Sequence, residues 1–319
     1  MTKCALSDCF APDLACSLGE TMLCRCKHWN TNVDDNFETV LNVDNEFHLP
    51  WTGLAMGLTD VGFISGCKKP KIVGVLGAEN AGKTSLLAAF YLLVSRGMAS
   101  KMQRRFAGSY TLEGWEAVST ALRWEPGFSP SFPAHTPSGS RRSPGLLHLA
   151  FQDTKSRLIE DYLFADAPGE WFGKWALNSD SPDAEGARWL SNNADIFLLI
   201  VDREALSGEK KGLARSELRR LIQRLAGERG KRPVAVVWTK GDMPEDVAME
   251  NSVRQHIISA LQEITEFKVQ VLKNENPNSM SENSLLLLLN WVLEQLPMKG
   301  ELPVIERNIS DPFFMFKQS

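Results

Sequence analysis

The chain has 319 residues, of which 43% are hydrophobic and 23% are charged, a composition typical of a folded globular protein. A formal net charge of −4 gives no global reason to expect nucleic acid or an anionic membrane as a partner. Residues 1–20 lack a basic start followed by an apolar run, and the most apolar segment, 285–293, is far shorter than the roughly 20 residues that span a bilayer. We therefore expect a cytoplasmic protein without a membrane partner.

Residues 1–66 show little hydrophobic periodicity and contain most of the cysteines. These are Cys4, Cys9, Cys16, Cys24 and Cys26. A zinc ion needs four N or S ligands, usually delivered by short paired spacings, and these spacings do not form C-x2-C pairs. We expect a small Cys-containing N-terminal module with a connector. Two interpretations stay open for it, a Zn²⁺ site that uses Cys4, Cys9, Cys16 and one of the last two cysteines, and a set of unligated thiols.

The pattern changes to alternating strands and helices near Lys71. Residues 72–76 form a short apolar run, typical of a strand buried on both faces, and 85–94 is typical of a helix. The residues between them, 77–84, match G-x-x-x-x-G-K-[ST] in full, so this segment predicts a phosphate-binding loop rather than a chance glycine-rich turn. Its backbone N–H groups and helix N-terminus would surround phosphates, while Lys83 reaches the β- and γ-phosphates and the Thr84 hydroxyl ligates Mg²⁺. The predicted nucleotide-binding residues are Gly77, Glu79, Asn80, Ala81, Gly82, Lys83, Thr84 and Ser85.

The rest of the chain continues the alternation. Apolar spacing favours a helix within 106–124, and five prolines in 125–145 predict a long surface loop. Further strands are expected at 146–151, 158–165, 196–201, 234–238 and, more weakly, 267–272, and further helices at 209–229, 245–265 and 284–296. This order predicts an open, mostly parallel α/β sheet with helices on both faces. We expect it to occupy a domain over 67–299, followed by a tail over 300–319.

Two more motifs follow apolar strands. Asp166-Ala-Pro-Gly169 places a carboxylate at the expected magnesium edge and an amide N–H near a γ-phosphate. Thr239-Lys240-Gly-Asp242 ends in a carboxylate that can accept both N1–H and N2–H₂ of guanine, a pair that adenine does not present. Each motif alone is common in ordinary turns. Their order after the phosphate loop predicts a guanine-nucleotide site.

The three motifs resemble the first, third and fourth signature motifs of the Ras-like P-loop GTPases, over about 71–296. More narrowly, the strings at 107–115, 134–136, 147–149 and 166–171 resemble those of the bacterial double-GTPase family, whose members are proposed to act in pairs in prokaryotic conflict or defence systems. The resemblance implies a GTPase switch that uses GTP or GDP with Mg²⁺ and has a protein partner, for which a second GTPase is one candidate.

The resemblance also implies roles for single residues. Lys83, Thr136 and Glu170 would be catalytic, and Thr84, Thr136 and Asp166 would hold Mg²⁺. Thr111 and Thr154 are rivals of Thr136 as the switch I threonine, and residues 170–190 would form switch II.

The sequence departs from the Ras pattern in several places. Glu170 replaces the usual glutamine, and Thr239 replaces the usual asparagine, which is expected to weaken the tether on the phosphate loop. The best candidate for a fifth motif is 272–275, and no arginine finger is identifiable. Slow or partner-activated GTP hydrolysis is therefore the first hypothesis. The alternatives are a nucleotide-binding scaffold with little hydrolysis and an ATPase of the same fold, against which Asp242 argues.

Residues 210–232 hold nine Lys or Arg and two Glu on a helix with an apolar stripe. We interpret this helix as packing on the sheet with a solvated outer face, rather than as a nucleic-acid surface.

Overall fold

The computed structural model describes residues 16–20, 22, 25–29, 55–66, 68–123, 131–132, 144–271 and 280–296. The chain divides into two units, Met1–Leu49 and Pro50–Ser319. In the first unit, the described residues form turns, in which the Trp29 N–H donates to the Cys26 carbonyl at 2.9 Å. The predicted domain boundaries at residues 66 and 299 stay predictions. The predicted tail over 300–319 lies outside the described residues.

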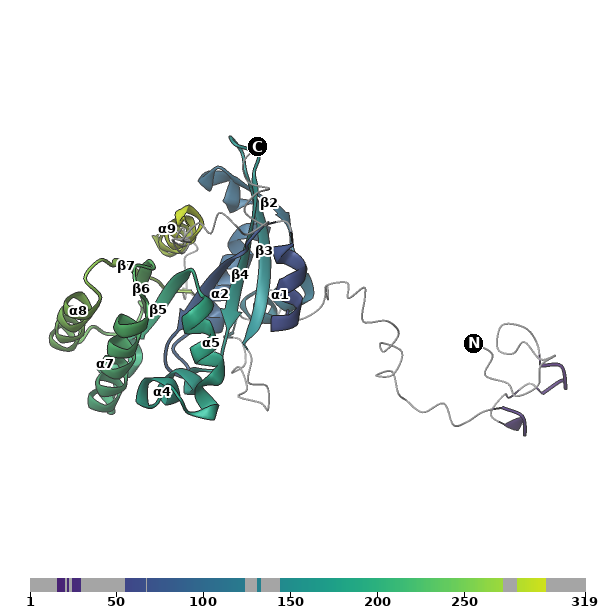
Figure 1. Ribbon diagram of the computed structural model, residues 1–319, viewed down its shortest axis with the longest axis horizontal. Coiled ribbons are helices and arrows are strands. Elements are labelled where there is room, and N and C mark those ends of the chain that lie inside the picture. The colour runs from purple at the N-terminus through teal and green to yellow at the C-terminus, as the bar shows by residue number, and fades with distance from the viewer. Residues whose placement is uncertain are drawn as a thin grey trace, which may run out of the picture. The chain divides into compact units, whose positions relative to one another are not determined.

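The second unit is built on a seven-stranded sheet (Figure 1). Its strands are β1 (Lys71–Leu76), β2 (Arg104–Gly108), β3 (Gly145–Asp153), β4 (Ile159–Asp166), β5 (Ile196–Asp202), β6 (Val234–Thr239) and β7 (Thr265–Lys268). The strand order is β2-β3-β4-β1-β5-β6-β7, and the pairs β4-β1, β1-β5, β5-β6 and β6-β7 are parallel. Both pairs that involve β3 are antiparallel, and β3 and β4 form a hairpin. The expected mostly parallel sheet is confirmed.

Helices cover both faces of this sheet (Figure 1). One face packs against α1 (Leu58–Ser65), α4 (Gly169–Leu177), α5 (Glu185–Asn193), α6 (Arg203–Ser207), α7 (Lys211–Glu228) and α8 (Val247–Leu261). The other face packs against α2 (Lys83–Ser95), α3 (Leu112–Ser119) and α9 (Met280–Glu294). Short 3₁₀ helices lie at Met98–Met102, Thr120–Leu122 and Pro182–Ala184. The expected covering of both faces is confirmed.

The strand side chains alternate between two hydrophobic cores. In β1, Ile72 and Leu76 belong to the core under α4 and α7, whereas Val73 and Val75 belong to the core under α2 and α9. Successive side chains of a strand point to opposite faces of the sheet, so a strand covered on both faces must be apolar at nearly every position. This requirement explains the continuous apolar runs in the sequence.

Several elements differ from the sequence-based expectations. Edge strand β2 lies in the segment where a helix was expected, and the helix begins only at Leu112. No residue of β2 is fully buried and two of them are arginines, so the strand shows no hydrophobic pattern, because an edge strand is only partly covered. Helix α1 lies in the segment interpreted as a connector, and it buries Ile64 against the sheet. Two helices, α4 and α5, occupy most of the predicted switch II.

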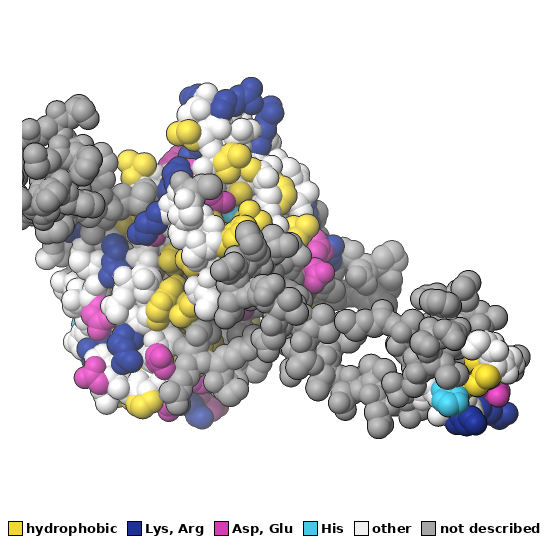
Figure 2. Space-filling model, turned by 45° about the vertical axis from the view of Figure 1, so that its right-hand side comes forward, with side chains coloured by type: hydrophobic (Ala, Val, Ile, Leu, Met, Phe, Trp, Pro, Cys, Tyr) yellow, Lys and Arg dark blue, Asp and Glu magenta, His cyan; other side chains and the backbone are white. Residues whose placement is uncertain are grey.

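In the part of the chain that the structure describes, no helix has the length and apolar character needed to cross a membrane. Figure 2 shows Lys and Arg side chains gathered at the upper end of the second unit, where Figure 1 has β2 and the β3–β4 hairpin. Exposed basic residues of this region include Lys101, Arg105, Lys155 and Arg157. We call this region the hairpin end.

Candidate functional site

The loops that follow β1, β4, β5 and β6 meet at one edge of the sheet, because parallel strands end at the same edge. A cavity of about 450 Å³ lies between them, a size typical of small-molecule sites. Its lining includes residues 80–85 from the first loop, 167–169 from the second, Glu204 from the third, and Thr239, Lys240 and Asp242 from the fourth. The three motifs of the sequence therefore surround a single cavity.

The first loop approaches its neighbours closely and ends at the start of α2. Gly82 has φ +88°, and Asn80 has φ +56°, both in the left-handed region that favours glycine and asparagine. A Cβ on Gly77 would lie 2.9 Å from the Cβ of Ile200, so the loop fits against β5 only with glycine there. Because Lys83 begins α2, the backbone N–H groups of this helix terminus point into the site and favour an anion.

Lys83 is buried and held by the loop itself. Its Nζ donates to the carbonyl oxygens of Ala78 at 2.7 Å and Gly77 at 3.3 Å. Burial lowers the pKa of Lys83 to about 8, against the opposing charges of nearby carboxylates, Asp166 first and Glu170 next. The ammonium group is therefore poorly solvated, and an anionic ligand would interact with it strongly.

Two predicted magnesium ligands lie together beside Lys83. The Thr84 hydroxyl donates to Oδ1 of Asp166 at 3.0 Å. A hydroxyl and a carboxylate are hard oxygen ligands of the kind that Mg²⁺ takes, and one or two protein oxygens plus substrate phosphates are its usual set. The pair therefore fits a magnesium ion. The third predicted ligand, Thr136, lies outside the described residues.

The start of α4 lies directly against the first loop. A Cβ on Gly169 would come 2.3 Å from the Glu79 backbone nitrogen and 2.5 Å from the Ala78 carbonyl carbon, distances that no real Cβ tolerates. Glycine is therefore required at position 169 by the close approach of two backbones. Glu170 follows in the first turn of α4 and is partly buried.

Thr239 ties the fourth loop to the first. Its hydroxyl lies 2.8 Å from the Ala81 carbonyl oxygen and 3.3 Å from that of Val201, and the side chain is buried. The sequence led us to expect that threonine would weaken the tether, and in the structure the hydroxyl makes the tether directly. The reason is that β6 ends close to the first loop, since a Cβ on Gly82 would lie 3.8 Å from the Thr239 Cβ.

Lys240 is fixed by two carboxylates from the segment after β5. Its Nζ donates to Oδ2 of Asp202 at 2.8 Å and to Oε2 of Glu204 at 2.7 Å. Burial lowers the pKa of Lys240, but these two carboxylates outweigh burial and raise it above its ordinary value. Lys240 has φ +55°, and the exposed Asp242 that follows also lines the cavity.

Arg203 is a site residue that the sequence reasoning missed. It is 3% exposed, and its Nε donates to Oε1 of Glu250 on α8 at 2.7 Å. Its Nη1 donates to the Gly241 carbonyl at 3.1 Å, and its Nη2 forms an ion pair with Glu245 at 2.7 Å. The guanidinium thus holds the loop that carries Asp242. Three consecutive charged residues, 202–204, directly after a buried strand were the signal that pointed to this position.

The two rival threonines do not line the cavity. Thr111 is fully buried, and its hydroxyl accepts the His148 N–H at 2.8 Å. Thr154 lies in the β3–β4 hairpin, at the opposite edge of the sheet from the cavity. The candidate fifth motif, 272–275, lies outside the described residues.

The predicted cysteine site is only partly within the described residues. Cys16 and Cys26 are free thiols, and Cys4, Cys9 and Cys24 lie outside that set. No group of three or more His, Cys, Asp or Glu side chains suited to a metal ion occurs among the residues with described positions.

Comparison with known proteins gives a family match and matches to several solved structures. A family model described as Double-GTPase 2 matches residues 71–292. Curated proteins give no match. Similar solved structures include Era in complex with MgGDPNP and nucleotides of 16S ribosomal RNA (17% identity, TM-score 0.34), covering 73% of this chain and 58% of that one. Roco2 of Methanosarcina barkeri bound to GDP is 13% identical (TM-score 0.35), and the match covers 80% of this chain and 53% of that one.

A variant of Era from Aquifex aeolicus bound to GDP·AlF₄⁻ is 18% identical (TM-score 0.34), and the match covers 72% of this chain and 57% of that one. The chain thus spans less than two thirds of the length of each of these three proteins.

Proposed function

The chain belongs to the double-GTPase 2 family, and from this premise we propose that it is a switch protein that binds GTP and hydrolyses it with Mg²⁺. One observation carries the proposal. Residues 80–85 of the phosphate loop and α2, residues 167–169, and Thr239, Lys240 and Asp242 line one cavity of nucleotide size, and the hydroxyl of Thr84 in this lining donates to Asp166. The cavity thus offers separate sets of protein groups for the phosphates, for a divalent cation and for the base of a nucleotide.

The phosphate end of the site has a distinct role for each group. The N–H groups at the start of α2 bind the β-phosphate, and Lys83 donates to phosphate oxygens in place of the two loop carbonyls that it now contacts. Thr84 and Asp166 hold Mg²⁺, with Thr136 as the proposed third protein ligand. When bound, the ion neutralises charge on the β- and γ-phosphate oxygens.

The base end of the site selects guanine. Asp242 accepts the N1–H and N2–H₂ of the base, and adenine offers no matching pair of donors. The aliphatic stem of Lys240 lines the cavity, while Asp202 and Glu204 hold its ammonium group. Thr239 fixes the distance between the base loop and the phosphate loop.

Hydrolysis needs a group that orients the attacking water, and Glu170 is the proposed one. Glu170 directly follows Gly169, whose backbone packs against the phosphate loop, and its charge opposes the lowering of the Lys83 pKa by burial, so it is also near the position of the γ-phosphate and repels it. We therefore propose slow hydrolysis that a partner accelerates. The resemblance to GTPases that are proposed to act in pairs in conflict or defence systems supports a second GTPase as that partner. The same repulsion favours the second candidate function, a GTP-binding scaffold with little turnover.

Nucleotide titration tests the guanine assignment. Fluorescent GTP and GDP should bind far more tightly than ATP, and Asp242→Asn should weaken GTP and favour xanthosine triphosphate, because an amide reverses one donor–acceptor pair. Glu263→Gln, on an exposed residue after α8, is the matched control and should change nothing. Equal affinities for GTP and ATP would reject the proposal.

Turnover tests the catalytic part. Glu170→Ala should not weaken GTP binding but should lower the single-turnover rate, and an unchanged rate would reject Glu170 as the water-orienting group. Chelation of Mg²⁺ by EDTA should weaken triphosphate binding and stop hydrolysis. Elemental analysis of the purified chain tests the separate prediction of Zn²⁺ at the N-terminal cysteines.

A further inference from the structure

Helix α7 carries a cluster of arginines that the nucleotide site does not use. The cluster consists of Arg215, Arg219, Arg220 and Arg224, within a helix that spans Lys211–Glu228. Arg215 and Arg219 are four residues apart, and so are Arg220 and Arg224. The two members of each pair are therefore adjacent on the helix surface, where like charges destabilise the helix. Among the described residues, Arg215, Arg219 and Arg220 form no ion pair with a carboxylate. The repulsion therefore persists in the chain by itself.

Other basic residues of the same segment have structural partners. Arg229 donates through Nη1 to the Arg232 carbonyl at 2.9 Å, and Arg232 donates to the Ala194 carbonyl at 3.0 Å. Lys211 pairs with Asp246 at 2.7 Å. These side chains join α7 to its neighbours, so their charge has a role in the fold. The four-arginine cluster has no comparable role, apart from a 3.6 Å pair between Arg224 and Glu228.

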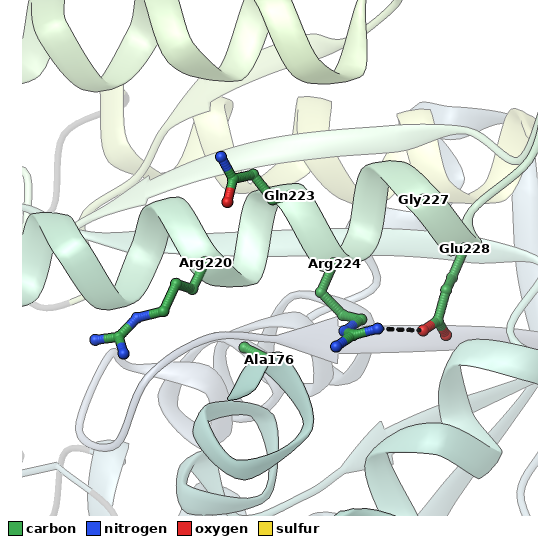
Figure 3. Close-up of a pocket in the computed structure, with 6 residues that line it drawn as sticks. All are labelled: Ala176, Arg220, Gln223, Arg224, Gly227 and Glu228. Atoms are coloured by element: carbon green, nitrogen blue, oxygen red, sulfur yellow. Dashed lines mark ion pairs between the residues drawn. The ribbon is translucent and has the colours of Figure 1, made fainter. Parts of the chain in front are cut away.

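A groove of about 360 Å³ lies between this cluster and α4. Its lining consists of Ala176, Arg220, Gln223, Arg224, Gly227 and Glu228. Figure 3 shows Arg220 and Arg224 extending from α7 on the side of that helix where Ala176 of α4 lies. The Arg224 Nε is buried without a hydrogen-bond acceptor, which is a costly state for a charged donor. Ala176 and Gly227 leave room for an incoming side chain.

From this arrangement we infer that the α4–α7 groove docks an acidic segment of a protein partner. A guanidinium presents a fork of donors that matches a carboxylate in two parallel hydrogen bonds, and arginine is enriched at protein interfaces for that reason. An Asp or Glu seated in the groove gives Arg220 and Arg224 acceptors and relieves their mutual repulsion.

A nucleic acid fits the surface less well than an acidic peptide. Glu217 and Glu228 lie on the same helix, and the chain as a whole has a net charge of −4. Nucleic acid presents a continuous row of phosphates and is held by extended positive surfaces, whereas the groove offers a short site with one carboxylate at its edge.

The groove also connects the docked segment to the nucleotide. Helix α4 begins at Gly169 against the phosphate loop and ends beside the groove, and its Phe172 and Trp175 share a hydrophobic core with α7. A displacement of α4 by the γ-phosphate therefore changes the shape of the groove, and affinity for the acidic segment depends on the bound nucleotide. This connection rests on the proposed function, whereas docking itself does not.

Fluorescence anisotropy on the full, nucleotide-free chain tests docking. The probe is a short fluorescein-labelled peptide of alternating Glu and Ala, compared with a Lys–Ala peptide and a single-stranded oligonucleotide of equal charge. Arg220→Gln/Arg224→Gln should weaken the acidic peptide about tenfold without lowering the thermal stability, because a repulsive pair is removed. The matched control, Lys101→Gln/Arg105→Gln, removes the same charge from the hairpin end and should leave affinity nearly unchanged.

Three results would overturn docking: no binding of the acidic peptide, tighter binding of the oligonucleotide, or equal losses in the two double variants. If the groove variant unfolds, the single variant Arg220→Gln replaces it, because Arg220 also lines the groove, and an unchanged affinity in that variant would equally overturn docking. The peptide is then titrated against protein loaded with GDP or a non-hydrolysable GTP analogue. Equal affinities of the peptide for the two loaded forms would reject the connection to the nucleotide. If the chain binds neither nucleotide but still binds the peptide, the proposed function is rejected and the docking proposal is retained.

Discussion

Replacing Arg203 by methionine should destabilise the protein strongly, because the change leaves a carboxylate buried without its cation. The side chains of Arg203 and Glu250 are 3% and 6% exposed. Breaking such a pair from one side costs about 3–5 kcal/mol, since the remaining charge keeps its desolvation penalty. A typical domain has a free energy of unfolding of about 5–15 kcal/mol. Arg203→Met should therefore lower the urea midpoint severely.

A double variant separates stability from positioning. Arg203→Met/Glu250→Leu replaces the buried pair by apolar side chains, which is often neutral or even stabilising. It should recover most of the lost stability. It should not recover the hydrogen bond to the Gly241 carbonyl, which lies in the loop that carries Asp242. The loss of one such bond, about 1 kcal/mol, corresponds to a loss of GTP affinity of several-fold.

The assays are urea unfolding followed by tryptophan fluorescence and titration with fluorescent GTP and ATP. Arg232→Met is the control, because this arginine also donates to carbonyls between elements but lies away from the cavity. It should lower stability without changing the ratio of GTP to ATP affinity. The reasoning would be refuted if Arg203→Met cost less than about 1 kcal/mol, or if the stable double variant kept the full GTP affinity of the wild-type chain.

Three further changes test other contacts of the site and the core. Thr239→Val leaves a buried carbonyl of the phosphate loop without its donor, so it should lower the free energy of unfolding by about 1–3 kcal/mol and weaken GTP binding. Thr239→Ser keeps the hydroxyl and should bind GTP normally. Identical calorimetric titrations of the two variants with GTP would contradict the tether. Gly169→Ala should displace α4 from the phosphate loop and destabilise the protein by about 1–3 kcal/mol. Gly173→Ala lies in the same helix, where a Cβ meets nothing within 4 Å, and should stabilise the protein by up to about 1 kcal/mol. Thermal melts of the two variants test this difference. Burial, together with the hydrogen bond to Glu116, raises the pKa of Tyr91 to about 12, so the wild-type chain should lose stability as pH rises from the unfolded-state pKa of about 10 toward 12, because only the unfolded tyrosine ionises there. Tyr91→Phe should lack this component of the pH dependence in urea unfolding, and equal slopes for the two proteins would exclude it.

The sequence determined the central strands of the sheet and the phosphate loop, because both follow from local requirements. Strands β1, β5 and β6 are buried on both faces, so each must read as a continuous apolar run. A loop that wraps phosphates with backbone N–H groups needs glycines and a lysine at fixed spacing. The order of the three motifs was likewise enough to place them at one edge of a parallel sheet.

Tertiary structure alone decided the features that depend on partners distant in the chain. Arg203 meets Glu250 across 47 positions, and the Thr239 hydroxyl meets the Ala81 carbonyl across 158, so no local pattern could reveal either contact. Edge strand β2 exists because β3 lies beside it, although its own residues are only partly buried and begin with two arginines. The basic run of α7 was interpreted from the sequence as a solvated face. Only the packing of α7 against its neighbours separates the arginines that hold the fold from those that line the groove, because burial and hydrogen bonding are properties of neighbours in space.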